Sequence, residues 1–393
     1  MKKLFLPLIV LLLLLFAEIM KVYYIMPFPG SQQNDSVTFA YFLNRHLFWL
    51  RIPILLLIAY PVFMVLRSGR WWARVVLLLV LALYGFVFYM VNFRFLADRI
   101  FLQPHHKVFT SAANNRVPVD QLILGVCLNG QAKAYPIEIM GYHHQVQDTM
   151  GGEAIIVTYC TVCRSGRVYS PVINGKKETF RLVGMDHFNA MFEDSTTKSW
   201  WRQATGEAIA GPLKGKALKE IPSQQMTLSA WLRENPNSLV LQPDPDFARR
   251  YSGLAGYGKG TITGELEGTD IASWKPKSWV IGVLARNAAK AYDWNTLLQK
   301  QLIMDSMPGT TLMLTIEKDS STFHVFDRRV NGQILQFTLT GGQLNDTNTG
   351  SVWNEDGICI EGFLKGQELR RLPAYQEFWH SWKTFHPGTG EYR

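Results

Sequence analysis

Long apolar runs fill the first 95 residues and predict helices that span a membrane. Residues 75–91 carry no charge, and Trp71 and Trp72 precede them where an interfacial aromatic belt is expected. A second span is predicted at 47–66, because the prolines in this run are tolerated in lipid. A third is predicted at 4–17; no small-residue cleavage site follows it, which favours an uncleaved helix over a signal peptide. Residues 1–95 are therefore predicted to form a transmembrane segment of about three helices.

The distribution of basic residues predicts the orientation of these spans. Lys2 and Lys3 precede the first span, whereas the loop at 27–46 carries only Arg45. The turn between the second and third spans holds three arginines, Arg67, Arg70 and Arg74. Because short cytoplasmic loops retain Lys and Arg, three spans place the rest of the chain outside the cytoplasm. The predicted location is the inner membrane, as a multi-pass protein with its C-terminal domains on the extracytoplasmic (periplasmic) side.

Beyond residue 95 the pattern changes to short strand-like runs separated by turn residues. Residues 153–159 form one such run, and Asn174-Gly175 predicts a hairpin between 167–173 and 176–182 through a type I′ turn. Asn331-Gly332 repeats this signal. Few helices are expected: one capped by Thr227 and ending at Glu234, and one that begins at Pro373 and stops before Pro387. The predicted fold class is α+β and strand-dominated.

The chain after the spans resembles itself. Shifted by 157 positions, residues 123–126 fall on 280–283, and shifted by 151, Trp231 falls on Trp382. Several further glycines, prolines and aromatic residues match in the same order. Internal repeats of this kind indicate two related structural units. We therefore predict two tandem β-rich units, at 117–242 and 275–390, joined by a Gly- and Pro-containing linker at 243–274.

Composition and charge narrow the class of protein. Hydrophobic residues make up 48% and charged residues 18% of the 393 positions, which excludes a disordered chain. The formal net charge is +9, but many cations flank the spans and no dense basic run is present. Nucleic acid is therefore not an expected partner, whereas the membrane is.

Four side chains with metal-binding or redox chemistry lie in the first unit and are replaced at the matching positions of the second unit. His143, His144, Cys160 and Cys163 belong to this set. Their counterparts under the 157-residue shift are Lys300, Gln301, Glu317 and Ser320. Residues shared by both units, such as Ser199 and Trp201 with Ser351 and Trp353, are best explained as scaffold. The four unshared residues are therefore the candidate site.

The spacing of Cys160 and Cys163 allows two thiolates to bind one metal ion or to close a disulfide. A zinc ribbon needs a second CxxC, which is absent, and c-type haem needs a His where Arg164 stands. A thioredoxin-like site needs a following helix, whereas a hairpin is predicted. Two thiolates with His143 or His144 suit zinc or copper, and the soft sulfurs favour Cu(I). A redox or structural disulfide and unreactive thiols stay as alternatives.

The remaining cysteines and histidines are weaker candidates. Met185 and His187 could extend the site, and Cys127 and Cys359 are expected to be buried free thiols. The other histidines considered are expected at the surface or satisfied in the fold: His105, His106, His324, His380 and His386.

The first unit resembles a known prokaryotic family. The string Val157-Thr-Tyr-Cys-Thr-Val-Cys163, His143 followed five positions later by Asp148, the run Ser199-Trp-Trp201, and Gly206-Glu-Ala-Ile-Ala-Gly211 carry the resemblance to domain of unknown function 3179, over about 118–241. The family usually has Glu after the His and Pro after the first Cys, where this chain has His144 and Thr161. The resemblance implies a site around His143 and the two cysteines and implies no reaction.

Three functions are expected in order of preference. The first is a membrane-anchored extracytoplasmic protein that binds a copper or zinc ion through Cys160, Cys163, His143 and His144. The second is an enzyme, either a thiol-disulfide oxidoreductase or a cysteine-nucleophile catalyst with His143 as base. The third is a structural or assembly module without catalysis.

Overall fold

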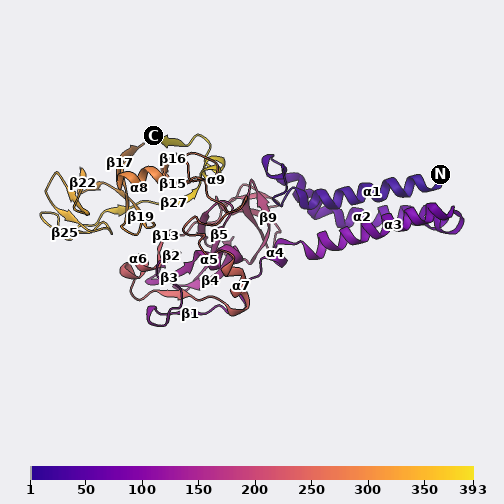
Figure 1. Ribbon diagram of the computed structural model, residues 1–393, viewed down its shortest axis with the longest axis horizontal. Helices are drawn as coiled ribbons and strands as arrows, with labels where there is room; N and C mark the ends of the chain where they lie inside the picture. The colour runs from indigo at the N-terminus through magenta and orange to yellow at the C-terminus, as the bar shows by residue number, and fades with distance from the viewer. Residues whose placement is uncertain (1) are drawn as a thin grey trace. The chain divides into compact units, whose positions relative to one another are not determined.

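The computed structural model describes residues 2–393, which form two compact units. One unit consists of the residues through Leu102 together with Glu178–Ala217, and the other consists of Gln103–Lys177 and Leu218–Arg393. The chain therefore leaves the second unit at Lys177 and returns to it at Leu218 (Figure 1).

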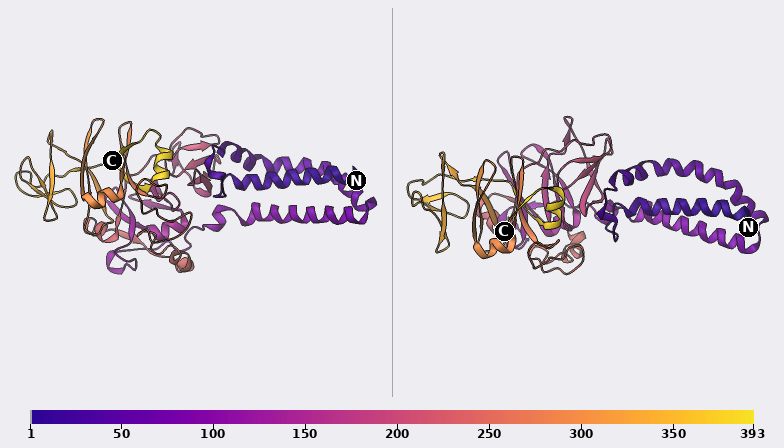
Figure 2. Two further views of the ribbon diagram at one scale, coloured as in Figure 1. Left: turned by 45° about the horizontal axis from the view of Figure 1, so that its top comes forward. Right: turned by 90° about the horizontal axis from the view of Figure 1, so that it is seen from above.

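Three long helices dominate the first unit. They are α1 (Lys2–Tyr23), α2 (Val37–Ser68) and α3 (Trp71–Tyr89), which run side by side in both views of Figure 2. Each is long and apolar enough to cross a membrane, so the three predicted spans are confirmed as helices of this kind. Helix α2 has 32 residues and begins ten residues before the predicted span. Most of the apolar side chains on these helices are exposed, as expected of a surface that faces lipid.

A buried polar contact ties the three helices together. Glu18 of α1 is fully buried and accepts a hydrogen bond from Arg51 Nε of α2 at 2.9 Å. Its other carboxylate oxygen accepts from Asn92 Nδ2 at 2.9 Å, and Lys21 Nζ donates to Asn92 Oδ1 at 2.8 Å. Asn92 lies in the π-helical turn η2 (Met90–Arg94) that continues α3. The bundle thus contains a compensated carboxylate, which explains how ionisable residues are accommodated among apolar helices.

A four-stranded sheet completes the first unit. Its strand order is β12-β11-β10-β9. The bounds are β9 (Phe180–Asp186), β10 (Asn189–Asp194), β11 (Trp200–Arg202) and β12 (Ala208–Ala210). Its core includes Trp200 and packs on the ends of α1 and α2 through Ile25, Ala40 and Tyr41. Gly184 is required here, because any Cβ would overlap the backbone of Ile25. The short helix α4 (Ala97–Ile100) also belongs to this unit.

The second unit contains the sheets that surround the candidate site. One sheet has the order β1-β14-β3-β2-β13 and another has β27-β15-β16-β28. The first comprises β1 (Phe109–Thr110), β2 (Leu122–Leu128), β3 (Gln131–Pro136), β13 (Ser223–Thr227) and β14 (Leu239–Leu241). The second comprises β15 (Trp279–Ala285), β16 (Ala288–Asp293), β27 (Ala374–Phe378) and β28 (Gly390–Tyr392). Strands β13-β2-β3-β14 and β27-β15-β16-β28 therefore occur in the same order.

The remaining sheets also correspond in pairs. Strands β4-β5-β6 match β17-β18-β19, the hairpin β7-β8 matches β20-β21, and β9 to β12 match β22 to β25. The bounds are β4 (Gln145–Met150), β5 (Glu153–Cys160), β6 (Ser165–Tyr169), β7 (Val172–Ile173), β8 (Lys176–Lys177), β17 (Leu302–Met307), β18 (Thr310–Ile316), β19 (Phe323–Asp327), β20 (Arg329–Val330), β21 (Gln333–Ile334), β22 (Phe337–Thr340), β23 (Gln343–Asp346), β24 (Val352–Trp353), β25 (Cys359–Glu361) and β26 (Arg370–Arg371). A strand-dominated α+β fold after three helices is confirmed. The relation of the two strand-rich segments, 117–242 and 275–390, as tandem repeats stays a prediction.

Local contacts repeat between the two segments. The rings of Trp231 and Trp382 pack on Gly125 and Gly282, where a Cβ would overlap the indole. Tyr135 donates to Asp148 at 2.8 Å, and Tyr292 donates to Asp305 at 2.9 Å. Both aspartates lie in strands β4 and β17 and accept from a buried tyrosine, so they are neither turn residues nor helix caps.

Two of the predicted elements need correction. The Asn174-Gly175 turn has the expected positive φ angles of 50° and 77°, but it joins only the two-residue strands β7 and β8. The flanking strands β6 and β9 pair elsewhere, so the long hairpin is wrong. Helix α9 (Trp379–Phe385) begins after Phe378, because Pro373 precedes strand β27 instead of opening the helix. Helix α6 (Leu228–Glu234) is confirmed, with Thr227 Oγ1 accepting from Ala230 N at 3.2 Å.

Candidate functional site

Cys160 and Cys163 lie in the tight turn between strands β5 and β6. Cys160 is the last residue of β5 and pairs with Ser165, the first residue of β6. Both cysteines are fully buried. The CxxC sequence therefore forms a turn between two antiparallel strands and is followed by a strand, in contrast to the helix of a thioredoxin-like site.

The antiparallel ladder brings His144 opposite the residue that precedes Cys160. Helix α5 (Ile137–His143) ends at His143, and His144 follows in the left-handed conformation with φ of 58°. Strand β4 then pairs with β5, with Gln145 opposite Thr158. The register extends one step further, because Tyr159 N donates to His144 O at 2.9 Å. His144 thus lies across from Tyr159, the residue directly before Cys160.

The side chain of His144 is held in one tautomer. Its Nδ1 lies 2.9 Å from the carbonyl oxygen of Tyr159, to which only a protonated nitrogen can donate. Burial lowers the pKa of His144 to about 4, so the ring is neutral at physiological pH. In a neutral ring with a proton on Nδ1, the lone pair is on Nε2. This is the arrangement in which a backbone carbonyl orients a metal-binding imidazole.

His143 is held by a different segment. Its Nε2 lies 2.7 Å from the hydroxyl of Tyr251, which belongs to helix α7 (Ala248–Ser252). Burial raises the pKa of Tyr251 well above its usual range, which keeps this hydroxyl protonated. The rings of Phe247 and Tyr142 also pack against the imidazole. His143 is therefore fixed among aromatic side chains, two of which, Phe247 and Tyr251, come from the segment predicted to be a linker.

Every backbone carbonyl from Thr161 to Cys163 is bound by a residue distant in sequence. Tyr257 donates its hydroxyl to Thr161 O at 2.7 Å, and Phe378 N donates to Cys163 O at 2.9 Å. Val162 O accepts from Lys277 Nζ at 2.8 Å and from His380 Nε2 at 3.0 Å. The turn is thus fixed by residues of the 243–274 segment and of the second strand-rich segment.

Lys277 gives the turn an electropositive neighbour. Burial lowers the pKa of Lys277, whereas negative charge at Cys163 and Cys160 raises this pKa. The same interaction, seen from the sulfurs, favours the thiolate over the thiol. His380 adds no charge, because burial and the nearby Lys277 lower its pKa to about 4. Lys277 is therefore the cation that would stabilise thiolates at this turn.

Two buried arginines, one in the turn and one in strand β6, fix the same hairpin. Arg164 is fully buried, donates from Nε to Gln376 Oε1 at 2.9 Å and stacks on the ring of Trp279 at 3.5 Å. Arg167 pairs with Glu377 of β27 and lies 3.6 Å from the centre of the Tyr375 ring. Because each guanidinium contacts strand β27, these side chains hold the hairpin against the second segment.

The other candidate residues lie elsewhere. Met185 and His187 belong to the first unit, where His187 Nδ1 bonds Asp186 at 2.8 Å. Cys359 is buried as expected, whereas Cys127 is exposed, because it falls near the end of strand β2. His324 is satisfied by Glu317 at 2.8 Å. The expectation that Cys127 is buried is therefore wrong.

Sequence reasoning missed the residues that surround the turn. Lys277, Tyr251, Tyr257 and Phe378 lie outside the predicted first unit, and three of them lie in or next to the predicted linker. The two tyrosines Tyr251 and Tyr257 could have indicated that 243–274 is packed against the fold, because large aromatic side chains are uncommon in a solvated linker.

Comparison with known proteins identifies the family. Residues 104–389 match the family described as protein of unknown function DUF3179, so the match covers both strand-rich segments and the stretch between them. No curated protein matches the chain, and no solved structure matches it. The family predicted from the CxxC string is thus confirmed over more than twice the expected length. The chain belongs to the DUF3179 family.

Proposed function

We propose that this protein is a membrane-anchored, extracytoplasmic metal-binding protein that holds copper or zinc with Cys160, Cys163 and the imidazoles of His143 and His144. The observation that carries the proposal is the hydrogen bond between His144 Nδ1 and Tyr159 O. It orients a neutral imidazole in the ladder position next to Cys160. Sulfur and imidazole together suit Zn²⁺ or copper, and a pair of thiolates favours Cu(I).

The surroundings of the turn support a metal thiolate. Thiolates bind metal ions and thiols do not, so a nearby ammonium that favours ionised sulfur also favours loading. Lys277 is placed for this role by its bond to Val162 O. The neutral His144 adds no charge that would oppose a cation.

We expect Cys160→Ser to remove most of the bound metal. The full chain, purified in detergent without a metal-affinity step, is analysed for copper and zinc by elemental analysis. Cys359→Ser is the matched control, since Cys359 is also buried and lies in a different sheet. Wild-type protein that carries neither metal after exposure to both ions would overturn the proposal.

The orientation of the spans is part of this proposal. Basic residues in the turn between α2 and α3 favour a cytoplasmic location for that turn. A C-terminal fusion to a reporter that is active only in the cytoplasm should therefore give no signal. A strong cytoplasmic signal would contradict an extracytoplasmic site.

A thiol-disulfide exchange reaction is the second candidate, favoured by the position of Lys277 beside both sulfurs. In this reaction one thiolate attacks a partner disulfide and releases a partner thiol. The second sulfur then displaces the other partner thiol, leaving Cys160 and Cys163 oxidised and the partner reduced by two electrons. Reversible oxidation of metal-free protein in a glutathione buffer would support this candidate. A protein that neither binds metal nor undergoes reversible oxidation of Cys160 and Cys163 would be a structural module.

A further inference from the structure

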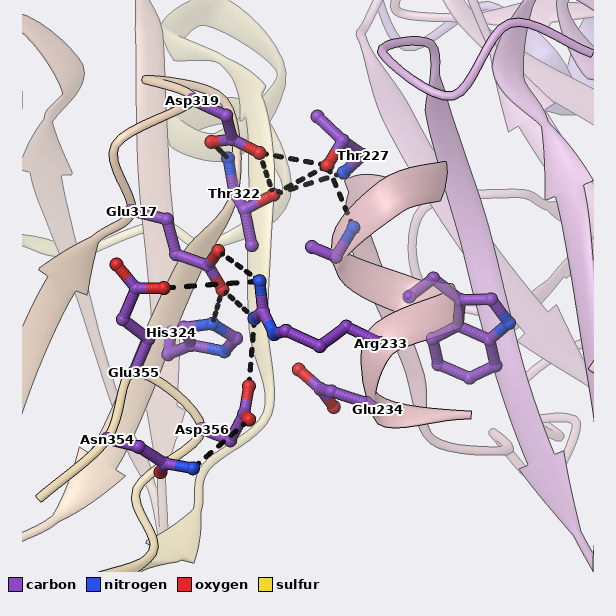
Figure 3. A network of polar contacts seen from close by, with 12 residues as sticks. Thr227, Arg233, Glu234, Glu317, Asp319, Thr322, His324, Asn354, Glu355 and Asp356 are labelled. Carbon is purple, nitrogen blue, oxygen red and sulfur yellow. Dashed lines mark hydrogen bonds and ion pairs between the residues drawn. The ribbon is translucent and has the colours of Figure 1, made fainter. Parts of the chain in front are cut away.

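A second cluster of ligand-type side chains lies in the other strand-rich segment. Glu234, Glu317, His324 and Asp356 each offer one oxygen or nitrogen atom, and these atoms lie within 4.8 Å of one another. Figure 3 shows them converging from helix α6 on one side and, on the other, from the residue after β18, from strand β19 and from the loop after β24. Glu317 and His324 are both buried, with His324 Nε2 2.8 Å from Glu317 Oε1.

One arginine occupies the centre of this cluster. Arg233 donates to Glu317 Oε1 at 2.7 Å and to Asp356 Oδ1 at 2.9 Å (Figure 3). Its side chain is 43% exposed, whereas the side chain of Glu317 is 6% exposed. The acceptors are therefore fixed in the fold, while the guanidinium has open solvent into which it can move.

The cluster carries more negative than positive charge. Its carboxylates are Glu234, Glu317, Glu355 and Asp356. The facing cations are Arg233, Arg371, which donates to Glu234 Oε2 at 2.7 Å, and Lys318. A further cation would be stabilised here.

Two buried oxygens, one in the cluster and one beside it, lack a hydrogen-bond partner among the described residues. One is Glu234 Oε1 and the other is Thr315 Oγ1. Thr315 is only 7% exposed, lies directly across from His324 in the β18-β19 ladder and lines a cavity of about 380 Å³ together with Glu317 and Asp356. Buried polar atoms without partners are rare in native proteins, so this pair indicates an additional ligand.

We infer that Glu234, Glu317, His324 and Asp356 form a second metal site, which takes a divalent cation of the Mn²⁺ or Zn²⁺ type. Three carboxylates and one imidazole are harder ligands than the two thiolates of the first site, so the two sites differ in the metal they prefer. Arg233 acts as the internal cation that holds the acceptors when no ion is bound.

The test uses the full chain in detergent and measures Mn²⁺ binding from the loss of the free-ion signal in electron paramagnetic resonance. Wild-type protein should bind Mn²⁺ saturably. Glu317→Gln and Asp356→Asn should each weaken binding by about tenfold or more, because each removes a charged ligand. Arg233→Gln should strengthen binding by at least about fivefold, since it removes the competing cation.

Matched controls separate this site from the first one. Glu368→Gln alters an exposed carboxylate of the same segment and should leave Mn²⁺ binding unchanged. Cys160→Ser should also leave Mn²⁺ binding unchanged. The proposed thiolate site and the second metal site are therefore tested independently. Asp356→Asn changes a side chain that is 18% exposed and is the variant to rely on if Glu317→Gln does not fold. The inference would be overturned if wild-type protein and Arg233→Gln both fail to bind Mn²⁺ and Zn²⁺. It would also be overturned if Asp356→Asn leaves binding unaffected.

Discussion

Replacing Arg167 by alanine should lower the free energy of unfolding by about 3–5 kcal/mol, the usual cost of removing one partner from a buried ion pair. The side chains of Arg167 and Glu377 are 2% and 1% exposed, so the variant leaves the Glu377 carboxylate uncompensated away from water. It also removes the stacking of the guanidinium on Tyr375. Chemical denaturation of the purified chain, followed by tryptophan fluorescence, measures the change.

A surface arginine provides the comparison for this experiment. Arg370 pairs with Asp327 at 2.7 Å but its side chain is 67% exposed, so Arg370→Ala should cost less than about 1 kcal/mol. The double variant Arg167→Met/Glu377→Leu should recover much of the lost stability, because it buries no charge. If the two single arginine variants lose equal stability, the buried pair has no special role.

Replacing Arg51 by leucine should destabilise the helical bundle strongly. Glu18 is fully buried and would lose its main partner, and an unpaired charge among membrane helices costs about 2.5–3.5 kcal/mol. We expect a lower melting temperature in detergent and less protein in the membrane fraction. Both are measured by heating the purified chain and by quantifying membrane-inserted protein.

Arg45→Leu is the control for this variant, because Arg45 lies on the same helix and is exposed. It should leave the melting temperature nearly unchanged. Glu18→Leu combined with Arg51→Leu should recover the bundle, since helices without the ion pair can still pack through apolar contacts. A single Arg51→Leu variant as stable as the control would show that Asn92 and Lys21 alone compensate Glu18.

Features that depend on neighbouring residues could be predicted from the sequence. Uninterrupted apolar runs identify α1 to α3, because a membrane helix needs only length and hydrophobicity. The turns at Asn174-Gly175 and Asn331-Gly332 follow from the positive φ that these residues tolerate. Thr227 was identified as a cap because its side chain accepts from a residue three positions away.

Features that depend on distant residues could not be predicted. The pairing of the CxxC turn with Phe378 and Lys277 follows from how β27 and the residues before β15 lie near this turn, and no local pattern encodes it. The same holds for the pair of Glu18 with Arg51, which lie on different helices. The long hairpin around Asn174-Gly175 failed because tertiary pairing took the flanking strands into two other sheets.

The contacts that close the CxxC turn span most of the folded domain in sequence. His380 binds Val162 across 218 positions, and Arg164 binds Gln376 across 212. Contacts of such separation form late in folding, because the entropy of closing a long loop must be overcome first. A nascent chain therefore exposes Cys160 and Cys163 in an incomplete turn until Gln376 and His380 have been synthesised. Oxidants and metal ions around the nascent chain would meet these thiols before Lys277 and Phe378 enclose them. The timing of synthesis therefore bears on whether the two sulfurs are oxidised or bind a metal.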